Sequence, residues 1–232
     1  MRIHLLIVLF ALGTAAPAQS ATRNFGISSF TKIRVDGPYR VALATGVAPY
    51  AKAEGSAPAL DRIAMEVRGD TLIVHPNPSW GGYPGSDVGS VQIRIGTHDL
   101  TSASLNGSGS LAIDQAKGLS FALNVQGSGA GEIGKVDVDQ LNVRIVGTAS
   151  GKLSGQAKKL TVLVRGVSAL NAADLKITDA SISADGSATI DANVDDSAEV
   201  NAWGPATVRL SGKPSCALKL AGSASVSGCK PQ

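Results

Sequence analysis

The residues that could support catalysis are few in this sequence. Besides His4, which lies in the N-terminal segment described below, the chain has only His75 and His98. A nucleophilic serine in a G-x-S-x-G elbow needs a second glycine two positions after it. The nearest match, Gly166-Val167-Ser168, has Leu170 at that position. Both histidines flank predicted strand ends, where a surface role is typical. We therefore expect no nucleophilic active site.

Carboxylates offer a second kind of chemistry. Asp191, Asp195, Asp196 and Glu199 supply the oxygen ligands that Ca²⁺ prefers, but their spacing matches no calcium loop, and charged turns are usual at the edge of a repeat array. Elsewhere the carboxylates are scattered, whereas glycoside hydrolysis requires them on one face. We therefore expect no metal site, no cofactor and no enzyme activity, with a carbohydrate-active enzyme as an alternative.

Three large aromatic residues are candidates for contact with a ligand or partner. Trp80 and Tyr83 lie in a glycine- and proline-rich loop, residues 76–90, and Trp203 lies at a predicted outward position. Aromatic side chains on a rigid scaffold can stack on sugars or bind a partner protein. The alternative is that the loop covers the open end of the fold and that Trp80 fills this end.

A sequence repeat predicts the strands of the fold that carries the candidate residues. One pattern recurs along the chain: alternating apolar residues, then a glycine, then small residues, then further alternating apolar residues. Its glycines are Gly107, Gly127, Gly147, Gly166, Gly186, Gly204 and Gly222, and subtraction of their positions gives intervals of 18 to 20 residues. The residues two and four positions before each glycine are apolar, and the residue between them is polar in six of the seven repeats. This alternation predicts a strand with one buried face, and the period predicts a solenoid.

Strands that recur once per coil must pair in parallel with their copies, and parallel crossovers are overwhelmingly right-handed. The sequence therefore predicts an all-β fold, a single-stranded right-handed parallel β-helix with coils of 18 to 20 residues. The small residues two positions after each glycine predict tight corners. The same register places Glu132 beside Lys152, and Asp191 beside Arg209, as ion pairs between adjacent coils.

The N-terminus has the features of a secretory signal peptide over residues 1–18. Arg2 supplies the positive start, Leu5 to Leu12 the short apolar run, and Ala16-Pro17-Ala18 the cleavage site. Residues 19–29 are polar and small, which predicts a flexible lead. No later segment is apolar over the length of a membrane span. We therefore expect an exported protein without a transmembrane segment, located in the periplasm, at the cell surface or outside the cell.

One domain is expected over residues 30–232, with irregular first coils or a cap at 30–99 and regular repeats at 100–229. Cys216 falls in an inward column and Cys229 where another coil would begin. In an exported protein this pair is expected to form a disulfide that closes the C-terminal end; two buried free thiols are the alternative. The net charge of only +3, without basic runs among aromatics, argues against nucleic acid as a partner.

Several motifs resemble a known family. They are Phe30-x-x-Ile33-x-Val35-x-Gly37 with Val41-x-Leu43, then Val67-x-Gly69-x-x-Leu72, then Leu100-Thr101 followed by Leu105-Asn106-Gly107-Ser108-Gly109. Together they resemble the bacterial putative auto-transporter adhesin head GIN domain (DUF2807) over about residues 30–229. The resemblance implies an exported β-helix without established enzymatic activity, and it supplies no catalytic residues.

The expected function is therefore that of a non-enzymatic exported binding or adhesion-type module of the bacterial cell envelope. A glycan or an envelope protein is the expected partner, contacted through Trp80, Tyr83 and Trp203. A structural periplasmic protein that meets a partner protein is a further alternative, besides the carbohydrate-active enzyme.

Overall fold

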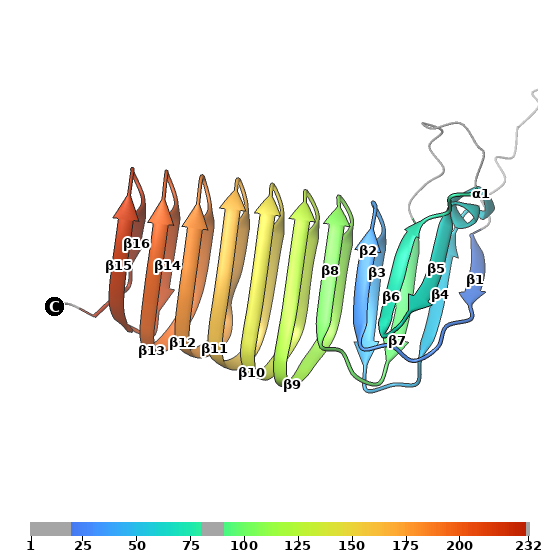
Figure 1. Cartoon of the computed structure of the whole chain (residues 1–232), viewed down its shortest axis with the longest axis horizontal. Coiled ribbons are helices and arrows are strands. Elements are labelled where there is room, and N and C mark those ends of the chain that lie inside the picture. The colour runs from blue at the N-terminus through green and yellow to red at the C-terminus, as the bar shows by residue number, and fades with distance from the viewer. Residues whose placement is uncertain (1–19, 80–90, 231–232) are drawn as a thin grey trace, which may run out of the picture.

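The computed structural model describes residues 20–79 and 91–230, which form an elongated stack of strands (Figure 1). The predicted signal peptide, residues 1–18, lies outside the described residues, as do Trp80 and Tyr83. The chain forms a β-solenoid of about six turns, as the repeat predicts. Within the described residues, no helix is long and apolar enough to cross a membrane.

Each coil runs along two walls that meet at a glycine corner. We name wall A the strands that follow the corners and wall B the strands that precede them. Wall A contains β3 (Arg40–Thr45), the first parts of β9 (Ser110–Gly127), β10 (Ala130–Gly147), β11 (Ser150–Gly166), β12 (Ala169–Asp185) and β13 (Thr189–Trp203), then β14 (Thr207–Ser211) and β16 (Ser225–Ser227). Wall B contains β2 (Lys32–Asp36), β8 (Ser102–Gly107), the last parts of β9 to β13, and β15 (Ser215–Ala221). The middle parts of β9 to β13 join the two walls and form what we name the turning side.

All pairings between successive coils are parallel, as predicted. β9 and β10, whose corners are separated by 20 residues, pair without any register shift. The coil from Gly147 to Gly166 is one residue shorter, and the difference is absorbed by a shift between Ile133 and Val136, before wall B resumes with Gly147 opposite Gly166. Where neighbouring coils differ in length, the strands therefore form a bulge near the turning side, and the corner glycines stay aligned. The right-handed sense of the coil stays a prediction.

The core fills the space between the walls. The column two positions before the corners is completely buried from Leu105 to Ala202. Leu220 belongs to the same column but is 45% exposed, because β15 is the last described strand of wall B and pairs only with β13. The predicted alternation of buried and outward residues is thus confirmed, and the stack is open at its C-terminal end.

The N-terminal part extends each wall first with a parallel strand and then with antiparallel strands. On wall A, β7 (Gln92–Thr97) pairs in parallel with β3, and then antiparallel with β4 (Tyr50–Gly55), which pairs with β1 (Ala21–Phe25). On wall B, β6 (Thr71–Pro76) pairs with β2 and forms a hairpin with β5 (Ile63–Arg68). The short helix α1 (Ala57–Asp61) joins β4 to β5. These strands lie at one end of the stack (Figure 1), in the region where the sequence predicts irregular first coils or a cap.

Residues 21–25 differ from the expected flexible lead. They form β1, whose five residues all pair with β4. Ala21 and Phe25 are partly buried against the core. The alternation of these small and polar residues is weak as a sequence signal, and the strand forms because β4 offers an edge with free backbone groups.

Two predicted contacts between coils are confirmed on the outer face of wall A. Lys152 Nζ lies 3.5 Å from Glu132 Oε1, and Arg209 bonds to both oxygens of Asp191, at 2.6 and 3.1 Å. The predicted Cys216–Cys229 disulfide is also present. It links β15 to the segment after β16, and so ties wall B to wall A at the open end.

Candidate binding surfaces

Of the three aromatic residues predicted as contacts, Trp203 is the one that the structure describes. It ends β13 on the outer face of wall B, between Asp185 of β12 and Ala221 of β15 in the strand register. Its side chain is 45% exposed, which leaves it accessible to a partner. The roles of Trp80 and Tyr83 stay predictions.

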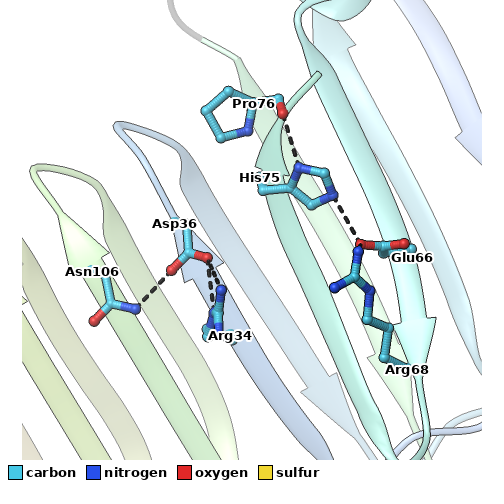
Figure 2. Close-up of polar contacts among 7 residues, drawn as sticks. All are labelled: Arg34, Asp36, Glu66, Arg68, His75, Pro76 and Asn106. Carbon is cyan, nitrogen blue, oxygen red and sulfur yellow. Dashed lines mark hydrogen bonds and ion pairs between the residues drawn. The ribbon is translucent and has the colours of Figure 1, made fainter. Parts of the chain in front are cut away.

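His75 belongs to a surface ion-pair cluster (Figure 2). Its Nε2 lies 3.2 Å from Glu66 Oε1, and the same oxygen lies 2.6 Å from Arg68 Nη2. The Nδ1 atom lies 2.8 Å from the carbonyl oxygen of Pro76. Since Arg68 already neutralises Glu66 and the ring contacts a carboxylate and a carbonyl oxygen, this arrangement serves to hold the β5–β6 hairpin together.

A second polar group ties β2 to β8 on the same outer face (Figure 2). Asp36 accepts hydrogen bonds from Arg34 Nε at 2.8 Å and from Asn106 Nδ2 at 2.7 Å. Arg34 and Asp36 lie on one strand and Asn106 on its neighbour, so these bonds connect successive coils. The arrangement resembles the ion pairs of wall A more than a pair of catalytic carboxylates.

The acidic residues considered as possible metal ligands do not lie together. Asp191 pairs with Arg209 on wall A, whereas Glu199 lies on wall B, 3.7 Å from Lys219. Across residues 20–79 and 91–230, no group of three or more potential ligand side chains could hold a metal ion.

The shifted pKa values also belong to structural contacts. A hydrogen bond from Lys52, together with the charge of Arg94, lowers the pKa of Glu54. A hydrogen bond from Lys32 lowers the pKa of Asp70, and burial raises the pKa of the Tyr39 phenol. A general acid or base works best with a pKa near the working pH, and these shifts all lead away from neutrality.

Several shallow hollows mark the outer surface of the described part of the stack, among them one on each wall and one on the turning side. One, of about 550 Å³, lies on the turning side and is lined by charged residues of both signs, including Lys117, Asp137, Lys158, Lys176 and Asp195. A second, of about 280 Å³, lies on wall B and is lined by Asn124, Asn142, Thr161 and Ser183 together with Arg144 and apolar residues such as Leu163. The third, of about 320 Å³, lies on wall A beside Tyr50. Sequence reasoning missed all three, because each combines outward positions from several coils.

Comparison with known proteins identifies the family. Residues 29–214 match the family described as "Putative auto-transporter adhesin, head GIN domain". No curated protein matches the chain.

Solved structures share the fold. A putative adhesin from Bacteroides fragilis is similar with a TM-score of 0.78 and 19% identity, over 90% of this chain and 95% of that one. A putative lipid binding protein from Parabacteroides distasonis follows with 0.67 and 20%, over 90% and 96%. A putative adhesin from Parabacteroides merdae has 0.64 and 15%, over 90% and 96%. At these identities the likeness concerns the fold, whereas the family match covers most of the sequence. The chain belongs to the putative auto-transporter adhesin family with a head GIN domain.

Proposed function

We propose that this protein is an exported, non-enzymatic binding module of the adhesion type in the bacterial cell envelope, with a glycan or an envelope protein as its partner. The observation that carries the proposal is the outer face of wall B. Its outward columns are rich in hydroxyl and amide side chains, with a few charged or apolar residues such as Arg144, Leu163 and Arg165 between them. The hydroxyl and amide residues include Ser104, Asn106, Asn124, Gln126, Asn142, Thr161, Ser181, Ser183 and Asn201.

Such a face suits recognition of a polar partner. From β8 to β13, its backbone is fixed by parallel pairing on both sides of each strand and by the buried core beneath it. A preorganised surface loses little conformational entropy on binding, and hydroxyl and amide groups both donate and accept hydrogen bonds. The family and two of the similar structures carry adhesin names, which agrees with this proposal. The disulfide and the predicted signal peptide support export, because disulfides persist in oxidising compartments.

Trp80, Tyr83 and Trp203 are proposed as contact residues. The test is co-sedimentation of the mature protein with isolated bacterial envelopes, for the wild type, a Trp80→Ala/Tyr83→Ala variant and a Trp203→Ala variant. Leu119→Ala is the matched control, because Leu119 is 79% exposed and lies on the turning side. We expect the aromatic variants to lose binding while their circular dichroism spectra stay unchanged. Unchanged binding would remove the aromatics from the contact surface.

The location of the protein in the cell distinguishes surface adhesion from a structural role inside the envelope. Protease added to intact cells should cleave the protein if it is displayed at the surface. Protection until the outer membrane is permeabilised would contradict surface adhesion and favour a periplasmic partner protein. Depolymerisation of a polysaccharide by the purified protein would contradict the non-enzymatic assignment.

A further inference from the structure

The hollow on wall A lies where long outward side chains are missing. Its floor is formed by Ala42 and Ala44 of β3, Ala112 of β9 and Gly134 of β10. Longer side chains stand around this floor, with Tyr50 and Arg94 on the N-terminal side and Glu132 on the C-terminal side. At about 320 Å³, the volume lies at the small end of the range for ligand pockets, roughly 300–1,000 Å³.

An aromatic ring forms one side of the hollow, and a glycine makes room for it. Tyr50 lies opposite Gly96 in the β4–β7 pairing. A β-carbon at Gly96 would come within 2.3 Å of Tyr50 Cε1 and 2.8 Å of Val47 Cγ2, so any larger residue at this position would displace the ring. Although the ring rests on the sheet, Tyr50 keeps 43% of its surface exposed. A rigid, accessible aromatic surface therefore borders an apolar floor.

The polar groups at the rim are held in place by neighbouring residues. Asp114 Oδ1 accepts hydrogen bonds from Thr45 N at 3.0 Å, Thr45 Oγ1 at 3.2 Å and Gln115 N at 2.6 Å. Oδ1 accepts all three hydrogen bonds, so Oδ2 can contact other groups. Arg94 Nη1 lies 3.3 Å from Glu54 Oε1, and Glu132 pairs with Lys152. The rim thus offers carboxylate acceptors and guanidinium donors around an apolar centre.

We propose that this hollow is a binding site for a neutral saccharide, most simply one pyranose unit of a glycan. One face of a pyranose ring exposes C–H groups, which pack against an aromatic ring and alanine methyl groups, while its hydroxyls both donate and accept hydrogen bonds. Asp114 and Glu132 accept hydrogen bonds from sugar hydroxyls, and Arg94 donates a hydrogen bond to a hydroxyl or ring oxygen. The rim carries both signs of charge, with Arg94 beside two carboxylates, of which Glu132 pairs with Lys152, and such a rim favours a neutral ligand over a charged one. This site rests on the proposed function and gives it a ligand class and a location.

The test uses the uniformly ¹⁵N-labelled mature protein and four probes, the methyl glycosides of glucose, galactose, mannose and N-acetylglucosamine, with glucose 6-phosphate as the anionic comparison. Amide shifts are followed in two-dimensional NMR spectra during titration. We expect at least one glycoside to shift amides in residues 42–44, 94–96, 112–114 and 132–134, and glucose 6-phosphate to bind more weakly.

Two site variants and one control variant test the site without touching the core. Ala112→Gln fills the floor at an exposed strand position, and Ser150→Gln is the control at an outward position of wall A two coils further along. We expect Ala112→Gln to abolish the shifts and Ser150→Gln to preserve them. Tyr50→Ala should weaken binding by up to about tenfold, the loss that corresponds to one aromatic contact.

The outcomes separate the site from the wider function. Shifts that survive Ala112→Gln, or that map to wall B near Trp203, would overturn the site while the proposed binding function stands. If none of the four glycosides shifts any amide, the saccharide site is overturned, and envelope co-sedimentation decides the proposed function independently.

Discussion

At the scale of single residues, the corner glycines combine an unusual backbone conformation with close approach of the neighbouring coil. Gly147 has a φ of +111°, and a β-carbon there would lie 2.3 Å from the carbonyl oxygen of Gly127. Gly118, on the turning side, has a similar φ of +125° but open space around the β-carbon position. Substitutions at these two glycines therefore distinguish the cost of the backbone conformation from the cost of steric overlap between adjacent coils.

We predict that Gly147→Ala destabilises the protein more than Gly118→Ala. Gly118→Ala should cost roughly 1–3 kcal/mol, as a residue with a side chain is forced into this backbone region. Gly147→Ala should cost more, because its methyl group also forces adjacent coils apart. Urea unfolding of both variants measures the difference. Equal losses would mean that the coils separate at a corner without cost.

Single carboxylates also set the response to acid. The pKa of Glu54 is lowered below its ordinary value of 4.5 by Lys52 and Arg94, and that of Asp70 below 3.8 by Lys32 and Thr71. A carboxyl group whose pKa is lower in the folded state stabilises it above the unfolded pKa, and this stabilisation is lost as the pH falls through the folded pKa.

We therefore predict that the free energy of unfolding falls as the pH drops below about 4.5, the ordinary value for Glu54. Lys32→Gln removes the hydrogen bond to Asp70 and should make this decline less steep. Urea midpoints of wild type and variant at several pH values between 6 and 3 test the effect. A variant with the wild-type slope would show that Asp70 does not contribute.

At the scale of elements, the last strands depend on the disulfide. β15 pairs on one side only, and Leu218 and Leu220 are 43% and 45% exposed, so little apolar burial holds this end in place. The Cys216–Cys229 bond closes a short loop, with a sequence separation of 13, between the two walls.

We predict that a Cys216→Ser/Cys229→Ser variant loses stability mainly at its C-terminal end. In the chain-entropy treatment, a loop of this size contributes about 3 kcal/mol. Each coil of a solenoid contacts only its neighbours, so hydrogen exchange should accelerate in β15 and β16 while β9 to β11 keep their protection. Uniform acceleration along the stack would instead indicate that the coils unfold together. Reduced wild-type protein should behave like the variant.

The elements also show what could be predicted from the sequence. The coils from β8 onward follow from a repeated local pattern, in which each apolar column has a counterpart one coil later. β1, β4 and β5 do not, because their antiparallel partners are set by pairing between distant segments that no period reveals. Gly37 illustrates the limit. The sequence indicates only a turn at Asp36-Gly37-Pro38, yet Gly37 aligns with the corner of the next coil, and its carbonyl oxygen would lie 3.1 Å from a β-carbon at Gly107.

The candidate saccharide site could not be predicted from the sequence for a similar reason. Tyr50, Gly96 and Ala112 come from three strands, and only the pairing order β4-β7-β3-β9 places them on one face. Aromatic residues in loops and turns stand out in a sequence as candidate contacts, whereas Tyr50 lies in a strand, β4. By contrast, Trp203 could be placed on an outward column, because its distance from Gly204 defines its orientation.

At the scale of the whole molecule, stability is distributed over equivalent coils. We predict that deletion of residues 148–166, one complete coil from corner to corner, leaves a folded and shorter protein. The deletion joins Gly147 to Val167, so the corner, both walls and the inward columns keep their register. The stack should shorten by about 4.8 Å and lose the apolar burial of Leu153, Leu160, Val162 and Val164.

Circular dichroism, small-angle X-ray scattering and urea unfolding test this deletion. The control deletes residues 148–157, which removes the wall A part of a coil and puts the remaining strands out of register. This control should not fold. A folded control would mean that the coils tolerate a broken register, which contradicts the role assigned to the corners.

The position of the disulfide also bears on how the chain matures. Cys216 and Cys229 are the only cysteines in the sequence, and they lie in β15 and just after β16, the last described strands of the two walls. The earlier coils contain no thiol, so no other disulfide within these residues competes with this one. Formation of this bond therefore requires a thiol oxidant but no disulfide isomerase.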